Sequence, residues 1–263
     1  MADPVLADPW RELRRYTQAR IALGRAGASL PTRALLDFGL AHAQARDAVR
    51  AALELAPTSE HLRALGWEPV AVRSAASDRE LYLRRPDLGR RLDAESATRL
   101  KAMAAAPPPD VAFVIGDGLS AQAAQRHAPG VLAALRAGLA TWRVAPVVLA
   151  QEARVALGDE IGALLGAVQV VVLIGERPGL SSHDSLGIYL THDPRLGRRD
   201  AERNCISNVR PQGLSYEAAA ARLLSLMHGA RRLGCSGVAL KDESGADAAL
   251  APPLSAPASG WRG

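Results

Sequence analysis

The chain has 263 residues and a mass of 27.7 kDa, enough for one large domain or two small ones. Apolar residues make up 48% and charged residues 22% of it, an ordinary globular composition that excludes a disordered, collagen-like or coiled-coil chain. The net charge is +5, from 32 basic and 27 acidic residues.

No apolar run approaches the roughly 18 residues that a bilayer crossing requires. The N-terminus has neither the basic start nor the apolar stretch of an export signal. We therefore expect a cytoplasmic protein. Cys205 and Cys235 are the two cysteines and lie outside any CxxC motif, which argues against a disulfide framework and a structural zinc site. Both thiols are expected to be reduced.

Arginine supplies most of the positive charge, since only Lys101 and Lys241 are lysines. Arginine is favoured at partner surfaces because its guanidinium pairs bidentately with carboxylates and phosphates. A GC-rich genome would produce the same bias. The arginines are spread along the chain and aromatic residues make up 4% of it, so nucleic-acid binding is not expected.

Residues 1–106 are expected to form an N-terminal helical region that ends at a run of three prolines. A helix start at Pro31-Thr32 precedes residues at three- and four-residue steps: Leu35, Phe38, His42, Ala45, Val49 and Leu53. We expect this face to pack inward, with His42 as a core histidine rather than a ligand. Eight arginines against three acids between Trp10 and Arg50 make the opposite face a candidate docking surface.

Short apolar runs alternate with helical stretches after the prolines. Strands are expected at 111–115, 146–149, 168–174, 186–190 and 205–209, and helices at 121–139, 161–165 and 216–233. This alternation predicts an α/β fold with a Rossmann-like, mostly parallel sheet over residues 107–241. Residues 242–263, rich in Ala, Pro, Ser and Gly, are expected to be a flexible tail.

Ligands of open α/β sheets bind at the carboxyl ends of the strands, so the loops there are the candidate sites. The first loop matches G-x-G-x-x-A through Gly116, Gly118 and Ala121, which resembles a dinucleotide fingerprint. However, Asp117 would point a carboxylate at the pyrophosphate, and no acid stands about 20 residues further on for the ribose. We expect instead a tight turn in which glycine supplies a positive φ and Asp117 caps backbone amides.

The second loop begins with Glu176 and Arg177, directly after the most apolar run of the chain. Adjacent residues seldom face each other. A contact of this loop with a ligand or another subunit is therefore favoured over an internal pair between the two side chains.

The third loop candidate is the polar run 200–210, which contains Cys205. A nucleophilic cysteine needs a base, and no histidine is close in sequence, although the fold could bring His183 or His192 near. A packed thiol is the favoured interpretation. Because the sequence also lacks GxSxG, HExxH and Walker motifs, it predicts a ligand-binding module without a complete catalytic set.

Five segments in order closely resemble the small subunits of ethanolamine ammonia-lyase: residues 19–27, 81–92, 117–120 (Asp-Gly-Leu-Ser), 175–180 (Gly-Glu-Arg-Pro-Gly-Leu) and 205–208 (Cys-Ile-Ser-Asn). The resemblance covers nearly the whole chain from Trp10 to about Val238. Any one segment would be weak evidence, but five in order are specific.

The resemblance implies a small subunit that completes an adenosylcobalamin site at the interface with a large subunit, which holds the substrate in a barrel. The complex would convert ethanolamine to acetaldehyde and ammonia by a radical mechanism, possible only for the hetero-oligomer. The implied cobalamin contacts are Val155, Glu176 and Cys205. No catalytic residue and no metal ligand is expected from this chain, and packaging into a bacterial microcompartment is an open expectation.

Some cobalamin proteins place a histidine on cobalt through a DxHxxG loop. The nearest segment here is 125–130, in which Gln125 stands where Asp should precede His127. We therefore expect the cofactor to keep its own benzimidazole on cobalt. Two alternatives are a nucleotide-dependent Rossmann-type oxidoreductase built on the Gly116 loop and a basic interaction protein.

Overall fold

A six-stranded mixed sheet forms the centre of the computed structural model, which describes residues 5–242. The strands run in the spatial order β1 (Pro69–Arg73), β3 (Val147–Gln151), β2 (Val111–Gly116), β4 (Gln169–Gly175), β5 (Leu186–His192) and β6 (Arg203–Val209). The first four are mutually parallel, and β5 and β6 are antiparallel to their neighbours. The predicted α/β fold with a mostly parallel sheet is thus confirmed.

The two departures from a fully parallel sheet have local causes. The connections before and after β5 contain no crossover helix, and a parallel return needs one. The chain therefore turns back on itself at each of them. Strand β1 lies within the region expected to be helical, where the β-branched Val70 and Val72 pair with β3.

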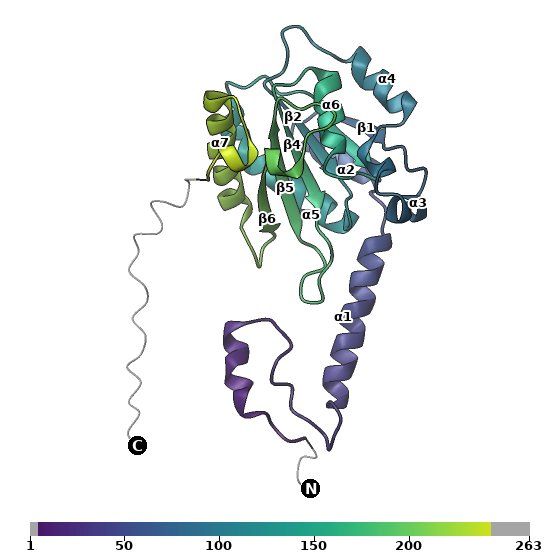
Figure 1. The fold of residues 1–263 in the computed structure, drawn as a ribbon, viewed down its shortest axis with the longest axis vertical. Coiled ribbons are helices and arrows are strands. Elements are labelled where there is room, and N and C mark those ends of the chain that lie inside the picture. Colours follow the sequence, from purple (N-terminus) through teal and green to yellow (C-terminus); the bar gives the residue numbers. More distant parts are fainter. Residues whose placement is uncertain (1–4, 243–263) are drawn as a thin grey trace, which may run out of the picture.

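Two layers of helices cover the sheet (Figure 1). The α-helices are α1 (Thr32–Arg50), α2 (Leu55–Ala64), α3 (Arg79–Arg84), α4 (Ala94–Ala102), α5 (Ala121–Leu135), α6 (Leu157–Leu165) and α7 (Tyr216–Leu233). The 3-10 helices are η1 (Pro9–Tyr16), η2 (Leu88–Arg90), η3 (Arg136–Leu139), η4 (Asp200–Glu202) and η5 (Gly237–Ala239). One hydrophobic core joins α2, α5 and α7 to one face of the sheet, and a second joins α4 and α6 to the other.

Helix α7 has the bounds predicted from its sequence because both of its ends carry strong signals. The hydroxyl of Ser215 accepts a hydrogen bond from the backbone N–H of Ala218 at 3.2 Å. Gly234 ends the helix in the left-handed conformation, which glycine adopts without steric cost.

The N-terminal arm, residues 5–50, projects from the sheet (Figure 1). The predicted inward packing of its helix α1 is wrong, since Leu35 is 58% and Phe38 43% exposed. His42 is also exposed and stacks on Phe38 with ring centroids 6.2 Å apart, so it is not a core histidine. Periodicity identified an apolar face that is exposed at Leu35 and Phe38, whereas Leu53 at its far end is buried and α1 contacts α5 there.

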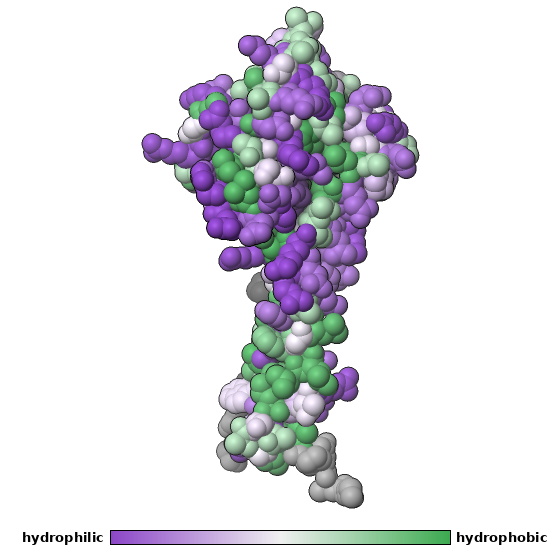
Figure 2. Space-filling view, turned by 90° about the vertical axis from the view of Figure 1, so that its right-hand side faces the viewer, coloured by the Kyte–Doolittle hydropathy of each residue, from purple (hydrophilic) through white to green (hydrophobic). Residues whose placement is uncertain are grey.

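Exposed large apolar side chains gather on this arm, as Figure 2 shows. Ten of the sixteen such residues within the described chain belong to it: Leu6, Trp10, Leu13, Tyr16, Ile21, Leu30, Leu35, Leu36, Phe38 and Leu40. Scattered single apolar residues are normal on a surface, but a contiguous group marks an interaction site.

Across residues 5–242, no helix is long and apolar enough to cross a membrane. The expected tail lies almost wholly outside the described residues. The division into a helical region before Pro107 and a sheet domain after it stays a prediction.

Candidate functional site

Glu176 is the first residue after β4, at the carboxyl end of that strand. Its carboxylate accepts hydrogen bonds from the Ser185 hydroxyl and from the backbone N–H of Asn208, the latter at 3.3 Å. Asn208 has a φ of 60°, a conformation that non-glycine residues rarely adopt and that concentrates at functional sites. In the described chain no ion pair joins Glu176 to Arg177, so the side chain is held by the loop and by β6.

Cys205 lies in the edge strand β6 with its thiol exposed, so the predicted packed thiol is wrong. Its Sγ lies 3.3 Å from the hydroxyl of Ser207, and it sits in register with Tyr189 of β5. Burial and the adjacent Cys205 thiol raise the pKa of Tyr189, so that phenol stays protonated at neutral pH. Alternation along β6 places Cys205 and Ser207 on the same face of the sheet.

Glu176, Gly187 and Tyr189 share that face. A Cβ built on Gly187 would lie 3.1 Å from Oε1 of Glu176 and 3.2 Å from a ring carbon of Tyr189. Val155, half-buried in the loop between β3 and α6, packs on the same hydrophobic core as Tyr189. The three residues expected to contact cobalamin therefore lie on the same side of the sheet, although they come from three separate segments.

We call this surface the open face: Gly187, Tyr189, Cys205 and Ser207, bordered by Val155 and Glu176. Helix α6 packs on β2 and β4 but leaves the thiol of Cys205 and the hydroxyl of Ser207 exposed at β6. The uncovered part of the face combines polar groups with apolar side chains at its border.

A buried ion pair fixes the distance between two sides of the open face. Arg203 of β6 donates to both carboxylate oxygens of Asp159 in α6, at 2.5 and 2.7 Å, and both side chains are 2% exposed. Burial raises the pKa of Asp159 in spite of this pairing. Arg203 lies two residues before Cys205 in β6, and Asp159 lies four residues after Val155. Sequence reasoning missed it, because nothing in a lone strand arginine identifies its partner.

The loop after β2 is the predicted tight turn. Gly118 has a φ of 56°, and a Cβ there would lie 2.3 Å from the carbonyl oxygen of Gly175. The carboxylate of Asp117 accepts hydrogen bonds from the backbone N–H groups of Glu152 and Ala153, each at 2.8 Å. This confirms amide capping, and β4 fills the space that a dinucleotide pyrophosphate would need beside Gly118.

His127 is fully buried in α5, and both ring nitrogens are engaged. Nδ1 lies 2.8 Å from the Tyr216 hydroxyl and Nε2 lies 2.8 Å from the Asp184 carbonyl oxygen. Burial lowers the pKa of His127, so the ring stays neutral. It is not placed to bind an external metal.

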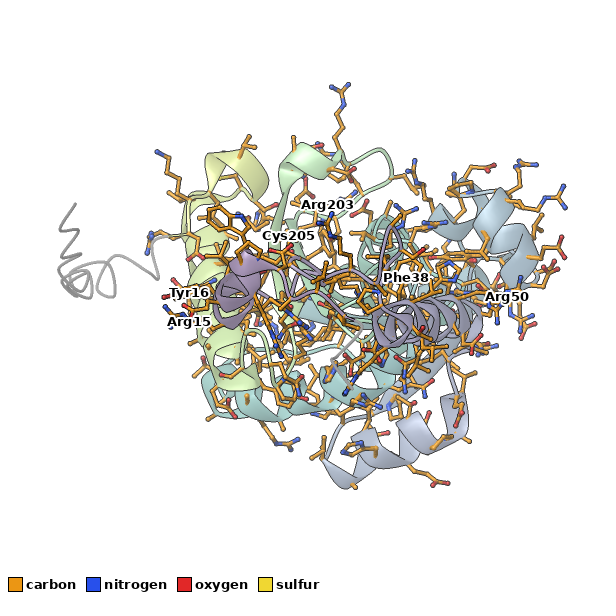
Figure 3. The ribbon with its side chains drawn as sticks, turned by 90° about the horizontal axis from the view of Figure 1, so that it is seen from below. Arg15, Tyr16, Phe38, Arg50, Arg203 and Cys205 are labelled. Carbon is orange, nitrogen blue, oxygen red and sulfur yellow. The ribbon has the colours of Figure 1, made fainter. Side chains whose placement is uncertain are left out.

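The arm meets the loop that carries Glu176. Arg20 donates to the carbonyl oxygen of Leu180 at 3.1 Å, and the Ser181 hydroxyl donates to the carbonyl oxygen of Gln18 at 3.4 Å. Figure 3, viewed from the arm side, shows Cys205 in projection between η1, at Tyr16, and α1, at Phe38. The arm and the open face thus adjoin the same loop.

Comparison with known proteins gives one consistent result. The family described as "Ethanolamine ammonia-lyase light chain (EutC)" matches residues 7–241. The ethanolamine ammonia-lyase small subunit of Pseudomonas syringae pv. tomato is 58% identical over 242 residues, which cover 90% of this chain and 84% of the relative.

Two further relatives carry the same description. The small subunit from Azotobacter vinelandii is 58% identical over 245 residues, or 92% of this chain and 91% of that protein. The small subunit from Ralstonia nicotianae is 56% identical over 242 residues, or 90% of each chain. The resemblance is confirmed over almost the whole described sequence, and it decides against the oxidoreductase and the free-standing basic interaction protein. The chain belongs to the ethanolamine ammonia-lyase light chain family.

Proposed function

We propose that the open face contacts adenosylcobalamin where this chain meets the large subunit of ethanolamine ammonia-lyase. The chain is the small subunit of this adenosylcobalamin-dependent lyase of ethanolamine degradation, which acts as a complex with the large subunit. One observation carries the proposal: Val155, Glu176 and Cys205, far apart in sequence, lie on one side of the sheet, which α6 leaves exposed at Cys205 and Ser207.

The residues of the open face suit a corrinoid, a wide ring fringed with amide side chains. Such a group needs a broad surface with apolar area and a few well-placed polar groups. Val155 and Tyr189 supply apolar area, Glu176 supplies a carboxylate, and Cys205 and Ser207 are exposed beside them. When bound, adenosylcobalamin supplies the radical chemistry that starts deamination.

Each bordering residue has a distinct proposed role. Glu176 already accepts two neighbouring hydrogen bonds, and a carboxylate has about four lone-pair sites, so it can accept more from amides or a ribose hydroxyl. Val155 offers an apolar wall, and Cys205 offers its side chain and backbone on the edge strand. His127 is engaged at both nitrogens, which supports a cofactor that keeps its own benzimidazole on cobalt.

We also propose that the arm docks on the large subunit. The charge pattern alone favours its basic face, but the exposed apolar residues of η1 and α1 are the stronger signal. Because the arm bonds to the loop after Glu176, its docking surface is continuous with the proposed cofactor site. A radical must be kept from water, so enclosure between two chains has a chemical purpose.

The site is tested by replacing Glu176 with Gln in the assembled complex and measuring cyanocobalamin binding by absorbance after gel filtration. Loss of a charged acceptor should weaken binding about tenfold or more. Glu68→Gln, an exposed glutamate beside β1, is the matched control and should bind normally. Unchanged affinity in Glu176→Gln would remove this residue from the site.

We propose a cytoplasmic location, with enclosure in a microcompartment as a further possibility. Fractionation of the host, followed by immunodetection of this chain, tests both. Recovery with sealed shell particles would support enclosure, and recovery with free protein would argue against it.

A further inference from the structure

The turn after β2, residues 117–120, touches both loops that border the open face. The sequence singled out this Asp-Gly-Leu-Ser segment, but the proposed cobalamin contacts do not include it. Its contacts lead toward Val155 on one side and toward Glu176 on the other.

Asp117 holds the backbone of the loop that leads from β3 to Val155. Its carboxylate, from a residue only 1% exposed, accepts hydrogen bonds from two successive backbone N–H groups, those of Glu152 and Ala153. Glu152 has a φ of 52°, which costs a non-glycine residue on the order of 1 kcal/mol and persists only where the surroundings enforce it. The Asp117 carboxylate therefore fixes an unfavourable backbone conformation three residues before Val155.

The rest of the turn holds the backbone before and after Glu176 by hydrogen bonds. The backbone N–H of Leu119 donates to the carbonyl oxygen of Gly175 at 3.0 Å, and the Ser120 hydroxyl donates to the carbonyl oxygen of His183 at 3.0 Å. A Cβ on Gly175 would lie 2.0 Å from the Ser120 carbonyl oxygen, so the two backbones are in direct contact. Any shift of the turn would displace Glu176.

Arg79 connects this turn to the arm. Its guanidinium donates to the carbonyl oxygen of Gly118 at 2.8 Å, to Glu152 at 3.0 Å and to the carbonyl oxygen of Val49, in the last turn of α1, at 2.7 Å. The side chain is 14% exposed. The guanidinium of Arg79 thus joins the end of α1, the turn at residues 117–120 and the loop that contains Glu152.

We infer that Asp117 is a positioning residue for the cobalamin-contacting face: it sets the place of Val155 relative to Glu176 without touching the cofactor. The inference rests on the proposed function of that face. Residues that hold the groups around a cofactor affect its affinity through those groups.

The energetics of Asp117 support this role. Burial raises the pKa of the Asp117 carboxyl to about 6, which means that the charged form is disfavoured in the folded chain. A buried carboxylate that lowers the stability of the folded chain is expected where the function of the protein requires it. An asparagine could accept one of the two amide bonds but could not reproduce two charged acceptors.

The test compares Asp117→Asn with Asp110→Asn. Asp110 lies just before β2, is 5% exposed and accepts a hydrogen bond from the backbone N–H of Arg143 at 2.8 Å. It is therefore a buried aspartate of the same kind at the opposite end of the same strand. Each variant is assembled with the large subunit, and its Kd for cyanocobalamin and its kcat at saturating adenosylcobalamin are measured.

We expect Asp117→Asn to raise the Kd about tenfold and to leave kcat at saturation within about twofold, whereas Asp110→Asn leaves the Kd unchanged. Equal Kd values for the two variants would overturn the inference. If Asp117→Asn does not assemble, Arg79→Lys decides instead: a raised Kd supports positioning, and an unchanged one overturns it. If Glu176→Gln also has no effect, the proposed function itself fails, and not only this inference.

Discussion

Helices α1 and α7 are similar in length, with 19 and 18 residues, and differ in what covers them. Helix α7 buries Leu223, Leu226 and Met227 against the sheet. Helix α1 buries only two alanines and leaves Leu36 and Phe38 exposed. The same periodic pattern therefore produced one helix that is covered by its own chain and one that is not.

The difference shows what an apolar stripe does and does not specify. An apolar stripe indicates that this face of the helix is stable only when another surface covers it. It does not indicate which molecule provides that surface. For α7 the partner is the sheet of the same chain. For α1 we propose the large subunit, because the arm also contacts the loop after Glu176.

The largest expected effect is on the free energy of unfolding, and it tests whether α7 is buried by its own chain while α1 is not. Leu223→Ala should lower the free energy of unfolding of the full chain by about 2–5 kcal/mol, because Leu223 is fully buried and a cavity remains. Leu36→Ala, at a side chain 67% exposed, should change it by less than about 0.5 kcal/mol. Denaturant unfolding measures both values. A comparable loss in Leu36→Ala would mean that α1 packs within the chain.

A second prediction concerns the point where α1 joins the sheet. Burial raises the pKa of Asp117 to about 6 from the ordinary 3.8, with Arg79 and Glu152 as its charged neighbours. The unfolded chain therefore ionises Asp117 at lower pH than the folded chain does. Stability from this group is present below pH 4 and is lost as the pH rises through 6.

Asp117→Asn removes this titration. The unfolding free energy of the unmodified chain minus that of the variant should fall by on the order of 3 kcal/mol between pH 4 and pH 7. Denaturant unfolding at a series of pH values measures the difference. A flat difference would show that Asp117 does not titrate with a raised pKa.

The third and smallest expected effect is on association with the large subunit, and it compares exposed side chains of α1 and α7. Phe38→Asp on α1 should weaken association with the large subunit about tenfold, because the proposed interface would bury this aromatic side chain and a charge would take its place. The control is Leu233→Asp on α7, where the side chain is 55% exposed. It should change the Kd by less than about twofold. Analytical ultracentrifugation of the mixed subunits measures both, and equal effects would contradict docking through α1.

Much of the sheet domain was predictable because its signals are local. The runs near Val111, Val147 and Gln169 became β2, β3 and β4, and the helix predicted over 216–233 became α7. Strand β1 was missed because its five residues lie among helical patterns. The antiparallel direction of β5 and β6 follows from the absence of crossover helices around β5, which the predicted element order already contained but the expectation of a mostly parallel sheet did not use.

The candidate site was less predictable than the fold. Glu176 and Cys205 came from the resemblance, and their segments were also visible as polar loops. The exposure of Cys205 was not foreseen, because a strand pattern does not tell whether a helix covers that face. The Arg203–Asp159 pair and the contacts of Asp117 link residues 44 and about 35 positions apart, beyond the range of any local pattern.

The amino-acid sequence by itself determined the family, the α/β class and most helix and strand positions, because periodicity, capping residues and ordered motifs act over a few neighbouring residues. Only the tertiary structure decided that Val155, Glu176 and Cys205 lie on one side of the sheet, that Asp117 supports two loops at once, and that Leu36 and Phe38 of α1 stay exposed. These depend on which distant segments meet, and that is fixed by the packing of the sheet rather than by any single segment.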